Sequence, residues 1–192
     1  MARLPDAVES GVRGEAAALF EKLIAKRGRI DGMYTTLLNH PQLAGMIGDL
    51  GTFFRFGDSV LDDETREFVI LYVASRLRIA YEWVKHKGPA RDAGISEDII
   101  EALRQGGRDP LDNLQIDLVS IADCALSLQN IPQQLQDRVV RHVGMHGMLE
   151  LVALVGFYRL IGGIITCFDV PLPHGESDPF SETSGDMIHE SC

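Results

Sequence analysis

Residues Asp62–Ala80, DDETREFVILYVASRLRIA, decide the fold of this chain. Their apolar side chains recur at helical spacing, with Phe68 and Tyr72 on one face and further apolar residues beside them. A helix that is apolar on more than one side is usually buried between neighbouring helices. Asp62 or Asp63 can cap its start, because a carboxylate accepts hydrogen bonds from the free N–H groups of the first turn. We therefore predict a buried helix over 62–80.

The same helical spacing continues on both sides of this stretch, and glycine and proline fall between the periodic segments. Ser96 is a candidate N-cap, and Gly106 and Gly107 would end the helix that follows it. Segment 81–94 is expected to be helical but broken at Gly88-Pro89, because proline lacks an N–H and clashes with the preceding turn. The predicted class is all-α, with further helices over 10–27, 40–56, 96–105, 112–128, 132–142 and 145–167.

A possible internal repeat relates two of these helices. Five residues of the first, Glu67, Val69, Leu71, Arg76 and Leu77, align with identical residues of the second, Glu150, Val152, Leu154, Arg159 and Leu160. A duplicated helical unit would explain two similar apolar helices in one chain. We expect one helical domain over 1–173, followed by a polar tail over 174–192 that is mobile unless a neighbouring subunit holds it.

Composition limits the classes of function. The chain has 192 residues, 45% hydrophobic and 24% charged, which is the balance of a globular domain with its own core. Its formal net charge of -10 repels phosphate backbones and anionic membranes, so we expect neither as a partner. The start lacks the apolar run of a secretory signal, and charges interrupt the long apolar stretches, so we expect a cytoplasmic protein.

The three cysteines are Cys124, Cys167 and Cys192. They are odd in number and widely spaced, so they predict neither a disulfide framework nor a CxxC pair nor a structural zinc site.

The candidate chemistry lies in Tyr81–His86, YEWVKH, directly after the buried helix. Glu82 and His86 are four residues apart, which puts a carboxylate and an imidazole on one helix face as a possible proton-transfer pair. Trp83 could supply an apolar wall that excludes water. Alternatively, Glu82 belongs to a solvated face and pairs with nearby basic residues. Spacing alone leaves both interpretations open.

The stretch from Leu61 to Ser96 resembles the central signature of the carboxymuconolactone decarboxylase and AhpD-like family. In that signature an R-E-x-x-I-L helix leads to Y-E-W-x-x-H and then to A-x-x-A-G-I/L-S. Supporting similarity occurs at HPQLA over 40–44, at ELVALVGFYRLIGG over 150–163, and at VPLP over 170–173. The resemblance covers roughly residues 25–173.

This resemblance implies an all-helical, AhpD-like bundle that assembles as a trimer or hexamer. It also implies two different chemistries, because the family includes decarboxylating lyases and peroxidases that use a CxxC pair. Here the side chains of the YEW segment take the place of the cysteines, and neither Tyr81 nor Trp83 can do thiol chemistry. A thiol-dependent hydroperoxidase remains the alternative, and it requires Cys124 or Cys167 to lie near His86.

The preferred hypothesis is a decarboxylase-like lyase or isomerase that acts on a small carboxylated ring or lactone, without metal or organic cofactor. Glu82 and His86 are the predicted catalytic pair. The residues predicted to bind substrate are Tyr81, Trp83, Arg76 and Tyr158. An arginine would hold a carboxylate in a bidentate pair, and the candidates are Arg76, Arg78 and Arg159.

Two further possibilities stay open at this stage. His142 and His146 form a second i, i+4 pair, which is a metal half-site without an obvious third ligand, or a second acid–base pair. Alternatively, one of them faces solvent and the other packs at an interface or satisfies a helix end. The whole chain is alternatively a non-catalytic helical oligomer that binds a small ligand, in which case Glu82 and His86 would be exposed or lie away from any pocket.

Overall fold

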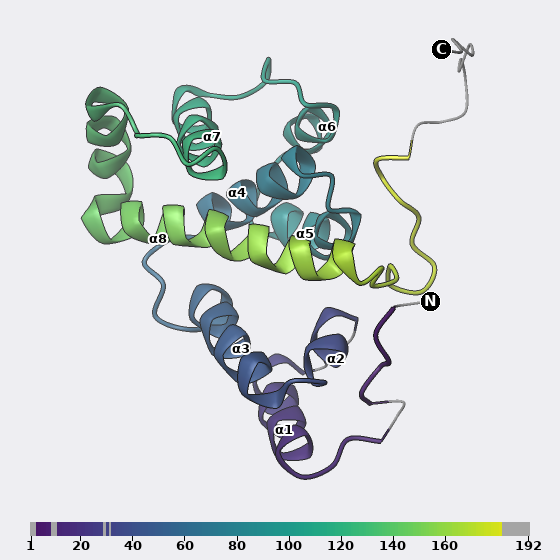
Figure 1. Ribbon diagram of the computed structural model, residues 1–192. Helices are drawn as coiled ribbons and strands as arrows, with labels where there is room; N and C mark the ends of the chain where they lie inside the picture. The colour runs from purple at the N-terminus through teal and green to yellow at the C-terminus, as the bar shows by residue number, and fades with distance from the viewer. Residues whose placement is uncertain (1–2, 9–10, 29, 31, 182–192) are drawn as a thin grey trace, which may run out of the picture.

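The computed structural model describes residues 3–8, 11–28, 30 and 32–181, and the regular structure within them is entirely helical (Figure 1). The predicted all-α class is confirmed. The helices are α1 Glu15–Arg27, α2 Met33–Leu37, α3 Pro41–Phe56, α4 Asp63–Arg76, α5 Ala80–Asp92, α6 Glu97–Gln105, α7 Asn113–Leu126 and α8 Gln133–Cys167.

Helix ends follow the predicted caps closely. Asp62 caps α4 by accepting the Thr65 N–H at 2.7 Å, and Ser96 caps α6 by accepting the Ile99 N–H at 3.4 Å. Gly106 ends α6 in the left-handed conformation, with φ 76°. These three helix ends could be predicted from the sequence because each depends on one local hydrogen bond or one glycine.

The predicted helix over 62–80 is shorter in the structure, and the predicted helical segment 81–94 corresponds to α5. α4 ends at Arg76 and α5 begins at Ala80, because Arg78 adopts a positive φ of 52° that turns the chain between them. Such a conformation is uncommon outside glycine, so the sequence carries no local signal for this turn. The short helix α2 was also not predicted.

The predicted break at Gly88-Pro89 is wrong, since α5 continues through Pro89 to Asp92. A proline normally disfavours helical conformation in the preceding residue, because its ring meets that residue's Cβ. Gly88 has no Cβ, so this clash is absent. The helix loses one backbone hydrogen bond and is held by packing, since Ala90, the residue after Pro89, is fully buried.

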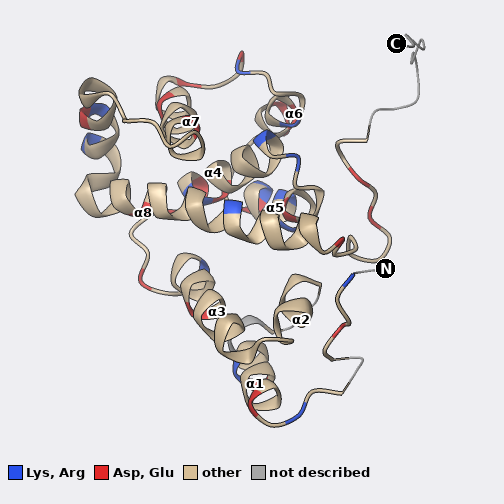
Figure 2. Ribbon diagram, viewed as in Figure 1, with Lys and Arg blue, Asp and Glu red and all other residues tan. Residues whose placement is uncertain are grey.

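Helix α8 has two parts, in agreement with the predicted helices over 132–142 and 145–167. Gly144 lies between them with φ 73° and ψ 175°, and the chain changes direction there (Figure 1). Its second part carries few charged residues (Figure 2). By length and composition α8 could cross a membrane, but half of its most apolar window is buried within the protein, as in the core helix of a globular domain.

The helices form two unequal groups (Figure 1). Helix α4 lies at the centre of the larger group and packs against α5, α6, α7 and α8, with every side chain from Thr65 to Ala74 buried. Helices α1 and α2 each pack against α3 below α8, and α2 contacts α8. The loop between the groups is held by Glu150, which accepts hydrogen bonds from Ser59 Oγ at 2.7 Å and Val60 N at 3.0 Å.

The first part of the predicted polar tail packs against its own chain. Phe180 is buried, and its ring lies edge-on to Trp83 with centroids 5.4 Å apart. Its carbonyl accepts a hydrogen bond from Arg78, and the Pro179 carbonyl accepts one from Arg104 at 3.0 Å. Phe180 therefore holds the described start of the tail against the domain, whereas we expected the tail to be mobile. Residues 182–192 lie outside the described part of the chain.

Candidate active site

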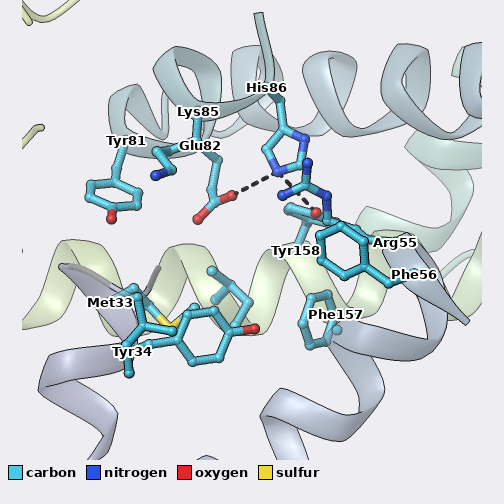
Figure 3. A pocket seen from close by; sticks show the side chains of 13 residues that line it. Met33, Tyr34, Arg55, Phe56, Tyr81, Glu82, Lys85, His86, Phe157 and Tyr158 are labelled. Carbon is cyan, nitrogen blue, oxygen red and sulfur yellow. Dashed lines mark hydrogen bonds and ion pairs between the residues drawn. The ribbon is translucent and has the colours of Figure 1, made fainter. Parts of the chain in front are cut away.

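A cavity of about 370 Å³ lies between the two groups of helices (Figure 3). Side chains from α2 and α3 form one wall, and side chains from α5 and α8 form the other. Most of the lining is aromatic or aliphatic, with a few ionisable groups, as is usual for a small-molecule site. The lining residues are Ile30, Met33, Tyr34, Gly51, Arg55, Phe56, Tyr81, Glu82, Lys85, His86, Phe157, Tyr158 and Ile161.

The hairpin of α4 and α5 brings the central groups together. A turn of only three residues joins the two helices, so Glu67 near the start of α4 faces His86 on α5. The Nδ1 of His86 lies 2.6 Å from Oε2 of Glu67, and both side chains are buried. Glu67 was not among the predicted site residues.

The other ring nitrogen of His86 faces two oxygen atoms in the cavity wall. The Tyr158 hydroxyl, from α8, lies 3.0 Å from Nε2, and Oε2 of Glu82, one turn earlier on α5, lies 3.4 Å from it (Figure 3). The predicted contact between Glu82 and His86 is therefore present. Three helices supply the four groups of this network.

The surroundings of His86 favour its charged form. Burial lowers the pKa of His86, but hydrogen bonds with Glu67 and Glu82 outweigh burial and raise that pKa above its ordinary value of 6.5. Burial raises the pKa of Glu67, but the hydrogen bond and charge of His86, with the charges of Arg55 and Arg66, bring it below 4.5. Glu67 is thus a carboxylate that accepts the Nδ1–H of His86, which leaves Nε2 as the nitrogen facing the cavity.

Tyr158 stays protonated in this setting. Burial and the negative charge of Glu82 hold the pKa of Tyr158 well above 10. Its hydroxyl can accept from a charged imidazole or donate to a neutral one. The network thus offers one mobile proton at Nε2, with Glu82 and Tyr158 as its neighbours.

This cluster is costly for the fold. Glu67, Glu82 and His86 are 2%, 5% and 3% exposed. Burying an ion costs roughly several kcal/mol of desolvation free energy, which its charged partners must offset. Apolar side chains of similar volume would fill the same space without this desolvation cost. A buried ionisable cluster that borders a cavity is a functional-site candidate for this reason.

Arg66 lies behind Glu67 and away from the cavity. Its Nη2 donates to Asp63 at 2.6 Å, and its Nε lies 3.6 Å from Oε1 of Glu67. That Nε is buried without a hydrogen-bond partner among the described residues. Its charge helps to keep Glu67 ionised.

Tyr81 lines the cavity, as predicted for a substrate-binding residue. Its hydroxyl and ring lie directly over Gly32, where a Cβ would collide with them. Gly32 also has a φ of 50°, so a glycine is required there on two grounds. The close contact between the backbone at Gly32 and the ring of Tyr81 shapes this end of the cavity.

Two predicted residues, Trp83 and Arg76, do not line the cavity. Trp83 is buried against Phe180 behind α5. Arg76 is more than half exposed and pairs with Asp123 on α7 at 3.2 Å. The other arginines considered, Arg78 and Arg159, donate to the backbone carbonyls of Phe180 and Leu126. The basic residues of the cavity are instead Arg55 and Lys85.

The described cysteines lie away from the cavity lining. Cys124 is half-buried on α7, and Cys167 is exposed at the end of α8. Cys192 lies outside the described residues. The arrangement that the hydroperoxidase alternative requires, a thiol beside His86, is therefore not formed by Cys124 or Cys167.

His142 and His146 do not form the expected pair. Gly144 lies between them with non-helical backbone angles, so the i, i+4 relationship of a continuous helix is lost, and both side chains are exposed. Across residues 3–8, 11–28, 30 and 32–181, no group of three or more His, Cys, Asp or Glu side chains is placed to hold a metal ion.

The missed residues have different explanations. Glu67 meets His86 through the way α4 and α5 pair across their turn, and the position of that turn was not predicted. Arg55 ends an amphipathic helix, and only the packing of α3 across from α5 brings it to the cavity. No spacing rule relates residue 55 to residue 86.

The sequence matches no protein-family model and no curated protein. Solved structures are similar. One is an uncharacterized peroxidase-related protein from Silicibacter sp. TM1040, with a TM-score of 0.74 and 15% identity over 90% of this chain and 92% of the other. Another is a cysteine-to-alanine variant of the debrominase Bmp8 in complex with 2,3,4-tribromopyrrole, with a TM-score of 0.68 and 13% identity over 93% of each chain. At these identities the similarity establishes the fold, and the predicted AhpD-like fold is confirmed.

Proposed function

We propose that this protein is an enzyme of the carboxymuconolactone decarboxylase-like type, which decarboxylates or isomerises a small carboxylated ring or lactone. His86 transfers the proton, and Glu82 and Tyr158 orient and share it. One observation carries the proposal: a buried imidazole lies between two carboxylates and turns one nitrogen toward a cavity of small-molecule size.

Decarboxylation needs an acid that protonates the substrate carbon from which CO₂ has left. When a substrate carboxylate leaves as CO₂, the C–C bond breaks and its electron pair moves into a conjugated carbonyl of the substrate, which forms an enolate. Nε2 of the charged His86 then gives its proton to the carbon, and His86 regains a proton from solvent. Glu67 holds the opposite nitrogen and keeps the ring charged and oriented until that transfer.

Isomerisation uses the same groups without loss of CO₂. Glu82 or a neutral His86 takes a proton from a carbon next to the carbonyl, and the same site returns a proton to another carbon of the conjugated system. Both reactions require a substrate that supplies its own electron sink. The aromatic walls of the cavity suit a planar ring, and the similar debrominase binds a small brominated pyrrole.

The other hypotheses have less support. The hydroperoxidase requires a thiol at the cavity, and Cys124 and Cys167 are not there. A non-catalytic binding protein was expected to leave the Glu82–His86 pair exposed or away from a pocket, whereas both residues are buried at the cavity wall.

The test measures CO₂ release from a panel of carboxylated lactones by wild-type protein and by the His86→Gln, Glu82→Gln and His146→Gln variants. We expect His86→Gln to lower turnover by about 10²- to 10⁴-fold, the usual contribution of an acid–base group. The exposed His146 is the matched control, and its variant should keep full activity. Turnover unaffected by His86→Gln would refute the proposal, and so would peroxide consumption that cysteine alkylation abolishes.

A further inference from the structure

Arg55 brings a positive charge to the cavity that the protein does not pair with a carboxylate of its own. It lies in the last turn of α3, is half-buried and lines the cavity. Among the described residues no carboxylate forms an ion pair with it, and its guanidinium lies 5.3 Å from the ring centroid of Phe56. A half-buried guanidinium that lines a cavity without an ion pair can bind an anion that enters the cavity.

The cavity has two ends, one on each side of His86, and Arg55 lies at one of them. Arg55 and Phe56 lie on one side of His86, and Tyr81 and Lys85 lie on the other (Figure 3). The aromatic rings of Phe56, Phe157 and Tyr158 surround the Arg55 end. An anionic group bound to Arg55 would be a substituent of a ring compound whose ring packs against these aromatic side chains.

We propose that Arg55 binds a carboxylate that the substrate keeps throughout the reaction, and that this contact selects anionic ring compounds. The inference rests on the proposed function for what happens at His86. A guanidinium bound to the departing carboxylate would stabilise the ground state and oppose the loss of CO₂, because it binds the substrate more strongly than the transition state. Arg55 therefore suits the retained carboxylate, and the reacting carbon lies nearer Glu82 and His86.

This assignment defines the class of ligand. A decarboxylated substrate carries at least two carboxylates, one lost and one kept, and an isomerised substrate carries at least one. The product is still an anion, so it competes with the substrate for Arg55. Arg55 comes from α3, whereas His86 and Tyr158 come from α5 and α8, so the ligand bridges the two groups of helices.

Binding of benzoate and of benzamide, its uncharged counterpart, tests the inference without any turnover. Isothermal titration with wild-type protein should show benzoate binding at least about tenfold more tightly than benzamide. In Arg55→Gln, benzoate binding should weaken about 10- to 100-fold and the preference should vanish. Arg141→Gln, at an exposed position of α8, is the matched control and should bind as wild type does.

A second variant guards against misfolding. Arg55→Lys keeps the charge but not the planar fork, so it should retain part of the preference if Arg55 contacts the anion. The inference is overturned if wild type does not prefer benzoate, if Arg55→Gln binds it unchanged, or if only Lys85→Gln removes the preference. Two results separate the two proposals. Benzoate binding that is lost in Arg55→Gln, with no turnover of carboxylated lactones by the wild type, supports the anchor and refutes the proposed reaction. Turnover that is lost in His86→Gln, with benzoate binding unchanged in Arg55→Gln, does the reverse.

Discussion

At the level of single residues, His86 is the centre of the site, and two carboxylates approach its ring from opposite sides. Glu82 was predictable because it shares a helix face with His86 four residues away. Glu67 was not, because its contact depends on how α4 and α5 pair across a turn that the sequence does not signal. The same limit applies to Arg55, which reaches the cavity only through the packing of α3.

Replacing Glu67 by glutamine removes one charge with little change of shape. We expect Glu67→Gln to lower the pKa of His86 and to reduce turnover by about tenfold or more, because the imidazolium loses its main partner. Steady-state rates across pH are the measurement. Glu64→Gln, an exposed position on the same helix, should leave the profile unchanged. An unaltered pH profile in Glu67→Gln would show that Glu67 has no part in setting the charge of His86.

The raised pKa of His86 also predicts a dependence of stability on pH. A charged His86 stabilises the folded protein fully below its ordinary pKa of 6.5, and this contribution is lost as the pH rises through the raised pKa. Glu67 behaves oppositely, since its contribution is present above 4.5 and is lost as the pH falls through its lowered pKa. Thermal unfolding of wild type and His86→Gln across pH should therefore converge on the alkaline side. Parallel curves over the whole range would contradict the prediction.

At the scale of helices, local chemistry predicted most boundaries. Caps at Asp62 and Ser96 and the left-handed Gly106 each left a signal in a few consecutive residues. Two predictions in this region were inaccurate: α4 ends at Arg76 rather than at residue 80, and α5 continues through Pro89. The positive φ of Arg78 leaves no local signal in the sequence, and Gly88 lacks the Cβ that the ring of Pro89 would meet.

Gly144 tests the division of α8 into two parts. Its φ of 73° with an extended ψ is a conformation that side chains rarely adopt, so Gly144→Ala should cost about 1–3 kcal/mol. Gly45 is the matched control, because it is helical and a Cβ there would make ordinary contact with Leu19. Gly45→Ala should be neutral or stabilising by about 0.5–1 kcal/mol. Urea denaturation measures both, and equal effects would contradict the kink as a glycine-dependent feature.

At the scale of the whole molecule, an exposed apolar stripe follows the second part of α8. Met145, Leu149, Val152 and Leu160 are 56%, 66%, 36% and 47% exposed, and their spacing puts them on one helix face. Apolar surface of this extent is usually covered by a partner. We propose that copies of this chain cover it, in keeping with the trimer or hexamer that the family resemblance implies.

Leu149→Glu should therefore dissociate the assembly, because it introduces a charge into the buried contact. Light scattering coupled to size exclusion gives the mass of the wild type and of the variant. Leu128→Glu is the control, since Leu128 is 86% exposed but lies outside the stripe, in the turn after α7. A monomeric wild type, or an assembly that Leu149→Glu leaves intact, would count against this surface.

The proposed function requires that His86 is a charged proton donor held between Glu67 and Glu82. The most direct measurement is an NMR titration of the His86 ring in the wild type, in Glu67→Gln and in Glu82→Gln, which needs no substrate. We expect the pKa of His86 to lie above 6.5 in the wild type and to fall in each variant, because each variant removes one carboxylate partner. A wild-type pKa at or below 6.5, or one that neither variant changes, would contradict this requirement.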